Sequence, residues 1–194
     1  GGGCHVGNVI SAGKCPHTGA HTFTVTYASK RISERNQPMV RTTIGILADT
    51  HGVLSPHVIT AFQRAEVAHI IHAGDICHHP NRLSIESLLT KLQEVAPVHA
   101  IAGNTDDKYM PQHGLPRRRS LKLGGLHLHL HHGDQMDDEA ALRAFRSSGG
   151  EDWPSDGKES GQHMIISGHS HTPSLRRDGG VLFLNPGSAG PPRF

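Results

Sequence analysis

The stretch Ile-Gly-Ile-Leu-Ala-Asp-Thr-His-Gly at residues 44–52 decides the fold class of this chain. Its first five residues form a short apolar run of the kind that a buried strand contains. Asp49 and His51 follow directly where that strand ends, and Gly52 allows the backbone to turn sharply. The stretch therefore predicts a buried strand whose carboxyl end carries two side chains of metal-ligating type.

The residues that follow alternate between helical and strand patterns. We expect helices over 55–68 and 81–95, and strands over 69–73 and 98–102. The Ser-Pro pair at 55–56 is typical of a helix start. Strands that alternate with helices predict a βαβαβ unit with a parallel sheet.

Beyond Tyr109 the pattern changes to hairpins. Strands are expected over 120–123, 126–131, 163–167, 175–177 and 181–184, with a helix over 137–147 and a polar loop over 148–161. The pairs at 124–125 and 179–180 are both Gly-Gly, which favours tight turns. Parallel strands early and hairpins late predict an α/β fold of two packed sheets with helices outside.

Residues 1–38 differ from the rest in composition, and only 21–27 alternate like a strand. We interpret 1–38 as an N-terminal extension of unknown role outside the core, and 39–194 as the domain. An alternative is a small zinc site in the extension, although its spacing is unlike known zinc motifs. Its ligands would be Cys4, His5, Cys15 and His17.

Composition narrows the class of protein. The chain has 194 residues, enough for one domain, and no apolar run long enough to span a membrane. Its net charge of +2 predicts no dedicated nucleic-acid surface. Three cysteines are too few for a disulfide framework, so we expect a reducing, cytoplasmic setting. The 18 histidines direct attention to metal binding.

Side chains that can ligate metal ions follow five of the expected strands. They are Asp49 and His51, Asp75, Asn104, His132, and His169 and His171. Ligand sites in open α/β sheets collect at the carboxyl ends of strands, so we expect these groups on one rim. Carboxylates, an amide and imidazoles favour Mn, Fe, Co, Ni or Zn over Ca or Mg. Asp75 is the expected bridge between two ions. Two ions about 3.5–4 Å apart can together bind the oxygens of a phosphoryl group.

The order of these motifs resembles that of the calcineurin-like metallophosphoesterases. Residues 41–194 are similar to their small prokaryotic YfcE-type phosphodiesterase branch. The motifs are LADTHG (47–52), HAGDI (72–76), AIAGNTD (100–106), HHGD (131–134), ISGHSHTP (166–173) and NPGSAGPPR (185–193). The resemblance implies a four-layer α/β/β/α sandwich, with two mixed sheets flanked by helices, and a dinuclear metal site.

The resemblance also implies roles for the individual residues. Asp49, His51, Asp75 and His171 would hold one ion, and Asp75, Asn104, His132 and His169 the other. Asp75, Asn104 and His132 would be catalytic. Two divalent transition-metal ions per chain are implied, with Mn²⁺ first and Fe, Ni, Co or Zn as alternatives. The implied activity is hydrolysis of a small phosphodiester by in-line attack of a hydroxide that bridges the ions.

One position departs from the wider family. Many relatives have a histidine after Gly-Asn, usually assigned as the acid for the leaving group, where this chain has Thr105. Threonine is no useful acid at neutral pH, which disfavours a phosphomonoesterase or a nuclease. His78, His79 and His113 stay open as substitutes. The alternative function is a non-catalytic protein-interaction scaffold of the same fold, like the retromer subunit. The sequence leaves open whether the protein forms a homo-oligomer.

Two further patterns give surface predictions. Leucine and histidine alternate over 126–131, so we expect the leucines and His132 to face the core. The intervening histidines are then expected on a solvated face. We likewise interpret the three arginines at 117–119 as a solvated face rather than a phosphate site.

Overall fold

The computed structural model describes residues 9–14, 21–29, 40–78, 82–123, 126–147, 162–178 and 180–190. The first half contains β1 (Val9–Lys14), β2 (His21–Ser29), β3 (Val40–Leu47), α1 (Pro56–Arg64), β4 (His69–His72), α2 (Ile85–Gln93), β5 (Val98–Ala100) and α3 (Asn104–Tyr109). The second half contains β6 (Arg118–Leu123), β7 (Leu126–His131), α4 (Asp138–Ser147), β8 (Gln162–Ile166), β9 (Ser174–Asp178) and β10 (Val181–Asn185). No helix in these ranges has the length and apolar composition needed to cross a bilayer.

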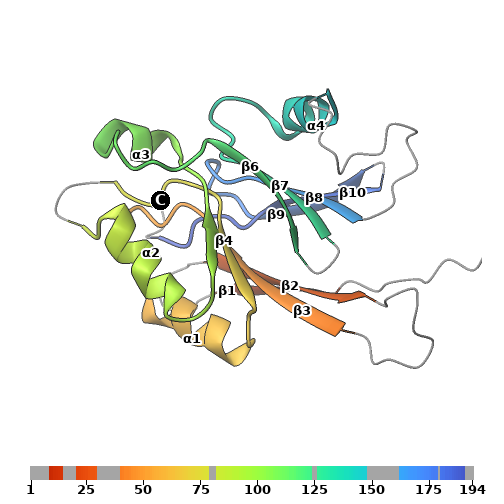
Figure 1. Ribbon diagram of the computed structural model, residues 1–194, viewed down its shortest axis with the longest axis horizontal. Helices are drawn as coiled ribbons and strands as arrows, with labels where there is room; N and C mark the ends of the chain where they lie inside the picture. Colours follow the sequence, from red (N-terminus) through yellow and green to blue (C-terminus); the bar gives the residue numbers. More distant parts are fainter. Residues whose placement is uncertain are drawn as a thin grey trace, which may run out of the picture.

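The strands form two mixed five-stranded sheets. The first has the order β1-β2-β3-β4-β5 and the second β6-β7-β8-β10-β9. β3, β4 and β5 are mutually parallel, as are β7, β8 and β10. In Figure 1 the sheets face each other, with α1 and α2 outside the first and α4 outside the second. The predicted four-layer arrangement is confirmed.

Three clusters of buried apolar side chains hold these layers together. Ile46 and Ile71 of the first sheet meet Leu128 and Ile166 of the second in the central core. α1 and α2 pack on the outer face of the first sheet, and α4 packs on the outer face of the second. Burying each large apolar side chain stabilises the fold by about 1.5–3 kcal/mol.

Side-chain caps set where the helices begin. The hydroxyl of Ser55 accepts a hydrogen bond from the first turn of α1, whose first residue is Pro56. The hydroxyl of Ser84 does the same for α2. The expected helices over 55–68 and 81–95 are therefore present, although both are shorter than their sequence patterns suggested.

The first sheet extends into the segment that we interpreted as an extension. β2 pairs antiparallel with β3, from Phe23 with Ile46 to Ser29 with Val40, and β1 pairs with β2. The backbone of residues 9–14 and 21–29 is thus paired into the first sheet, and the division of the chain at residue 38 stays a prediction. The physical reason for the pairing is that β3 would otherwise have an open edge, onto which an alternating segment can pair.

The prediction of a solvated histidine face on β7 is wrong. His127, His129 and His131 are only 5%, 6% and 2% exposed. The ring of His129 lies 4.7 Å from that of Phe145 on α4, and His131 Nε2 lies 3.1 Å from Asp138. A period of two separates the faces of a strand, but both faces of this sheet are covered.

Candidate metal centre

Backbone hydrogen bonds join the loops that follow β3 and β4. The amide of Asp49 donates to Gly74 O at 3.0 Å, and the amide of His51 donates to Asp75 O at 3.0 Å. These bonds continue the parallel pairing of the two strands beyond their ends. The side chains of three predicted ligands are thereby carried to the same point of the sheet edge.

Backbone strain in the described part of the chain is concentrated at the candidate ligands. Six residues other than glycine have φ between 49° and 66°. Five of them are predicted metal ligands: Asp49, His51, Asp75, His169 and His171. The left-handed conformation costs about 1–3 kcal/mol for such residues, and it persists where the surroundings impose it. This distribution indicates that ligand placement, rather than local preference, determines the loop conformations.

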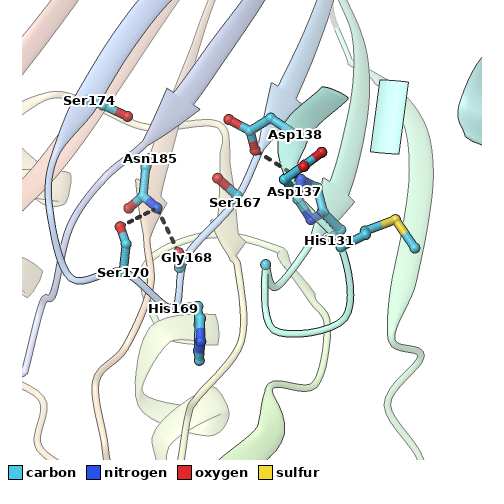
Figure 2. A pocket seen from close by; sticks show the side chains of 11 residues that line it. His131, Asp137, Asp138, Ser167, Gly168, His169, Ser170, Ser174 and Asn185 are labelled. Atoms are coloured by element: carbon cyan, nitrogen blue, oxygen red, sulfur yellow. Dashed lines mark hydrogen bonds and ion pairs between the residues drawn. The ribbon is translucent and has the colours of Figure 1, made fainter. Parts of the chain in front are cut away.

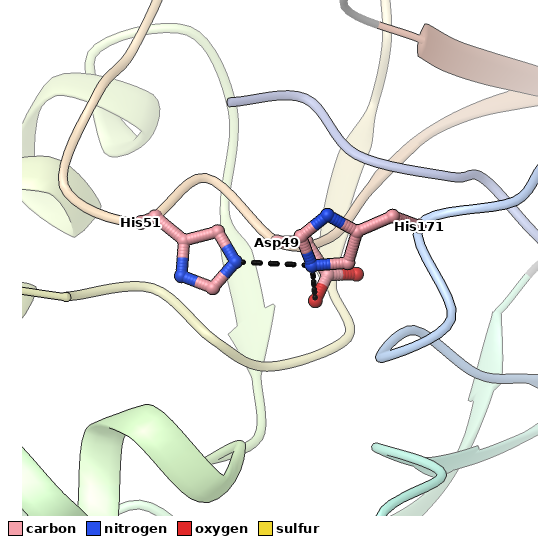
Figure 3. A group of neighbouring side chains, drawn as sticks. All are labelled: Asp49, His51 and His171. Carbon is pink, nitrogen blue, oxygen red and sulfur yellow. Dashed lines mark hydrogen bonds and ion pairs between the residues drawn. The ribbon is translucent and has the colours of Figure 1, made fainter. Parts of the chain in front are cut away.

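One group of candidate ligands consists of Asp49, His51 and His171 (Figure 3). The Nε2 atoms of the two histidines are 3.1 Å apart, and His171 Nε2 is 3.3 Å from Asp49 Oδ1. One ligand atom from each residue lies within 4.8 Å of the others. Two imidazole nitrogens and a carboxylate at this separation can hold a divalent transition metal.

A second group consists of Asp49, Asp75 and His132. Asp49 belongs to both groups. Asp75 also contacts a histidine of each group: its Oδ1 is 3.2 Å from His132 Nε2, and its Oδ2 is 3.9 Å from His51 Nε2. The predicted role of Asp75 as a bridge is compatible with these distances.

The tautomer of His132 fits a metal ligand. Its Nδ1 lies 2.8 Å from the carbonyl oxygen of Ala73, which only accepts, so Nδ1 carries the proton. In the neutral ring the lone pair of the buried Nε2 then faces Asp75 Oδ1 at 3.2 Å. A lone pair opposite a carboxylate is unfavourable unless a cation or a proton lies between them. Carbonyl support of this kind is usual for histidine ligands.

Asn104 and His169 lie on the open side of the centre. Asn104 is the exposed first residue of α3, and the next amide, of Thr105, donates to Asp75 Oδ1 at 2.9 Å. The ring of His169, also exposed, lies 5.3 Å from that of His132, and its amide donates to Asp49 Oδ2 at 3.0 Å. Their roles as ligands stay predictions.

Gly103 is required beside the second group. A Cβ atom at this position would lie 2.1 Å from Asp75 Oδ1 and 2.8 Å from His132 Nε2. Real Cβ contacts are never so short, so any side chain here would displace the candidate ligands. The backbone approaches the carboxylate closely because position 103 has no side chain.

Charge interactions oppose the effect of burial at this centre. Burial disfavours the charged form of Asp75, but hydrogen bonding and the charge of His132 hold its pKa well below the usual range. Burial likewise disfavours the charged form of His132, yet Asp75 raises the pKa of His132 to about 9. A proton and a metal ion therefore compete for Nε2 of His132 at neutral pH.

This competition predicts a pH dependence of metal affinity. Below pH 9 an ion must displace the His132 proton, so we expect the apparent affinity for the second ion to fall about tenfold per pH unit between pH 8.5 and 6.5. The affinity should level off above pH 9. Titration calorimetry with Mn²⁺ at several pH values measures this slope. A profile that is flat over the whole interval would contradict it.

Sequence reasoning assigned no role to Asp106, which is fully buried. Its carboxylate accepts hydrogen bonds from the amides of Ile76 at 3.1 Å, Cys77 at 2.8 Å and Gly103 at 2.8 Å. It thereby joins the loop that carries Asp75 to the loop before α3. The sequence signal that could have identified Asp106 is its place three residues after Gly103, where an acidic side chain can cap the start of a helix.

Arg117 also differs from its interpretation. Its guanidinium lies 3.0 Å from Asp107 Oδ2 on α3 and pairs with Asp134, two residues after His132. The expectation of a solvated face is therefore wrong for this arginine, since only tertiary contacts bring two carboxylates to it. The pairs connect α3 to the loop after β7.

A family model for the calcineurin-like phosphoesterase superfamily domain matches residues 43–194. A probable metallophosphoesterase of Methanothermobacter thermautotrophicus is 32% identical over 158 residues, which cover 78% of this chain and 79% of that protein.

Solved structures share the fold. The phosphoesterase YfcE from E. coli aligns with a TM-score of 0.52 at 22% identity, over 77% of this chain and 81% of that one. Vps29 from Entamoeba histolytica complexed with Zn²⁺ aligns with a TM-score of 0.55 at 22% identity, over 75% and 74%. The family model over residues 43–194 and the 32% identical relative show that the chain belongs to the calcineurin-like phosphoesterase superfamily.

Proposed function

We propose that this protein is a metal-dependent phosphodiesterase with two divalent ions, of which Mn²⁺ is the first expectation. The observation that carries the proposal is the position of Asp75, with one oxygen facing His51 and the other facing His132. A carboxylate so placed can be shared between ions and offset their mutual repulsion.

The donor set divides into residues that hold the ions and residues that face solvent. Asp49, His51 and His132 are buried, and we assign them to holding the ions with Asp75 and His171. Asn104 and His169 are exposed, so a phosphate can approach from their side. Two divalent ions held by the buried residues would stabilise charge on the phosphoryl oxygens. They would also lower the pKa of a water molecule that acts as the nucleophile.

Thr105 contributes no acid to this reaction. Its hydroxyl donates to Cys77 O at 2.6 Å and is buried, so it does not face the open side. Of the three histidine candidates, His113 pairs with Asp107 at 2.9 Å, and the ring of His78 lies 5.0 Å from that of His51. His79 lies outside the described residues. His78 thus lies beside the centre and stays a candidate acid. Because Thr105 supplies no proton, we propose that substrates whose leaving group departs without protonation are favoured.

Hydrolysis assays test the proposal. We expect metal-stripped protein to gain activity with Mn²⁺ and to cleave bis-p-nitrophenyl phosphate faster than p-nitrophenyl phosphate. The readout is release of p-nitrophenolate, with metal content measured in parallel. Faster cleavage of the monoester would contradict the assignment to diesters. Two bound ions per chain without turnover of either ester would favour the non-catalytic scaffold.

A further inference from the structure

A cavity of about 240 Å³ lies beside the candidate metal centre, at the carboxyl ends of the strands of the second sheet. His169, one of the residues assigned to the centre, forms part of its wall. In Figure 2, Asn185 and Ser170 lie on one side, and His131 and Asp138 lie on the other. A group attached to a phosphate at the centre would therefore adjoin this cavity.

The wall combines the apolar side chain of Met136 with several hydrogen-bond acceptors and hydroxyls. Two carboxylates, Asp137 and Asp138, and the hydroxyls of Ser167, Ser170 and Ser174 line the cavity. No lysine or arginine is among the described residues of its wall. An anionic substituent would meet two acidic residues and no lysine or arginine of the wall itself, whereas a hydroxyl or ammonium group would find acceptors.

Asp138 keeps its negative charge at neutral pH. Burial works to raise its pKa, but the hydrogen bond and charge of His131 and the hydroxyl of Ser167 lower the pKa below its usual value. The charge of Arg176 contributes in the same direction. The wall therefore has a negatively charged carboxylate held in place by its neighbours.

His131 holds the Asp138 carboxylate in position. The ring is 2% exposed, and its Nε2 lies 3.1 Å from Asp138 Oδ1. Since an ionised carboxylate only accepts, Nε2 carries a proton and donates to it. This contact fixes the orientation of the carboxylate in the wall of the cavity.

The opposite wall is also held in place. Asn185 Nδ2 donates to Gly168 O at 2.6 Å and to Ser170 Oγ at 3.2 Å, one residue on either side of His169. The wall thus has a defined shape before any ligand binds, which lowers the entropic cost of binding. The volume of the cavity is below the usual range of about 300–1,000 Å³ for sites of drug-sized ligands, so the cavity suits a small group.

We propose that this cavity binds the alcohol portion that remains on the phosphate, and that it selects small, non-anionic alcohols with hydroxyl or ammonium groups. The inference rests on the proposed phosphodiesterase function and adds a substrate class to it. Asp138 and Ser174 are then specificity-determining residues. They lie apart from the residues assigned to the ions.

Four mixed diesters test the inference, each with p-nitrophenol as the leaving group. The second alcohol is propyl, 3-hydroxypropyl, 3-aminopropyl or 2-carboxyethyl, so that the group in the cavity is the main variable. We expect kcat/KM with Mn²⁺ to be at least about tenfold higher for the aminopropyl than for the carboxyethyl diester. The hydroxypropyl diester should exceed the propyl diester.

Variants separate the cavity from the general charge of the protein. Ser174→Lys places a cation in the wall, and we expect it to lower the ratio of aminopropyl to carboxyethyl kcat/KM at least about tenfold. Asp138→Asn is a second variant, expected to lower the ratio in the same direction. Ser147→Lys adds the same charge at the exposed end of α4, outside the cavity, and should leave the ratio unchanged.

The outcomes distinguish this inference from the function on which it rests. Hydrolysis of all four diesters at equal kcat/KM, with no effect of Ser174→Lys or Asp138→Asn, would overturn the cavity assignment and leave the phosphodiesterase function intact. Equal effects of Ser174→Lys and Ser147→Lys would also overturn it. No hydrolysis of any diester with any metal would overturn the proposed function, and this inference with it.

Discussion

Replacing Asp75 with alanine is expected to abolish metal-dependent hydrolysis, with kcat reduced at least about 1,000-fold. The side chain faces His51 and His132 with its two oxygens, so its loss removes a carboxylate that contacts histidines of both groups of candidate ligands. We also expect the variant to bind at least one ion fewer per chain. Metal content and the rate of bis-p-nitrophenyl phosphate cleavage, measured on the same sample, test both expectations.

A matched control is Glu86→Ala, which removes an acidic side chain from the first turn of α2. Glu86 is exposed and takes no part in the candidate centre, so metal content and kcat should equal those of the unchanged protein. Circular dichroism of both variants shows whether the fold persists. An Asp75→Ala variant that is folded and keeps its ions and its rate would refute the proposed bridge.

Replacing Asp106 with alanine is expected to cause the largest loss of stability among single substitutions near the centre. Its carboxylate accepts from the amides of Ile76, Cys77 and Gly103, and all three would be left without this acceptor. Each buried unpaired donor costs about 1–3 kcal/mol, so we expect the free energy of unfolding to fall by about 3 kcal/mol or more. Urea-induced unfolding measures the difference.

The adjacent Asp107→Ala variant is the control for that experiment. Asp107 also lies on α3, but it is half exposed and pairs with Arg117 and His113 near the surface. Exposed ion pairs contribute about 0–1 kcal/mol, so the expected loss is correspondingly small. If the free energy of unfolding fell equally in the Asp106 and Asp107 variants, the three hydrogen bonds from backbone amides to Asp106 would not stabilise the loops as proposed.

Much of the fold follows from local sequence pattern. The apolar run at 44–48, the Ser-Pro start of α1 and the Gly-Gly pair at 124–125 each specify local structure without reference to distant residues. Prediction was less accurate at helix ends, where Ser84 caps α2 three residues later than expected. It also omitted α3, because a six-residue helix is too short to show an apolar period.

The grouping of the candidate ligands was largely predictable for a topological reason. Parallel strands have their carboxyl ends at one edge of a sheet, so Asp49, His51 and Asp75 had to lie near one another. His132 and His171 come from the second sheet, and their place beside the first depends on how the sheets face each other. The resemblance of the motifs to a known family supplied that information, which periodicity alone lacks.

Two packed sheets, their covering helices and the chemical types of side chain at the strand ends could be predicted from the amino-acid sequence, because these depend on periodicity and connection order. The burial of His127 and His129, the three hydrogen bonds from backbone amides to Asp106 and the cavity beside His169 became known from the three-dimensional packing. Each depends on contacts between residues far apart in the chain. Such contacts are fixed by the packing of layers, which a local pattern does not specify.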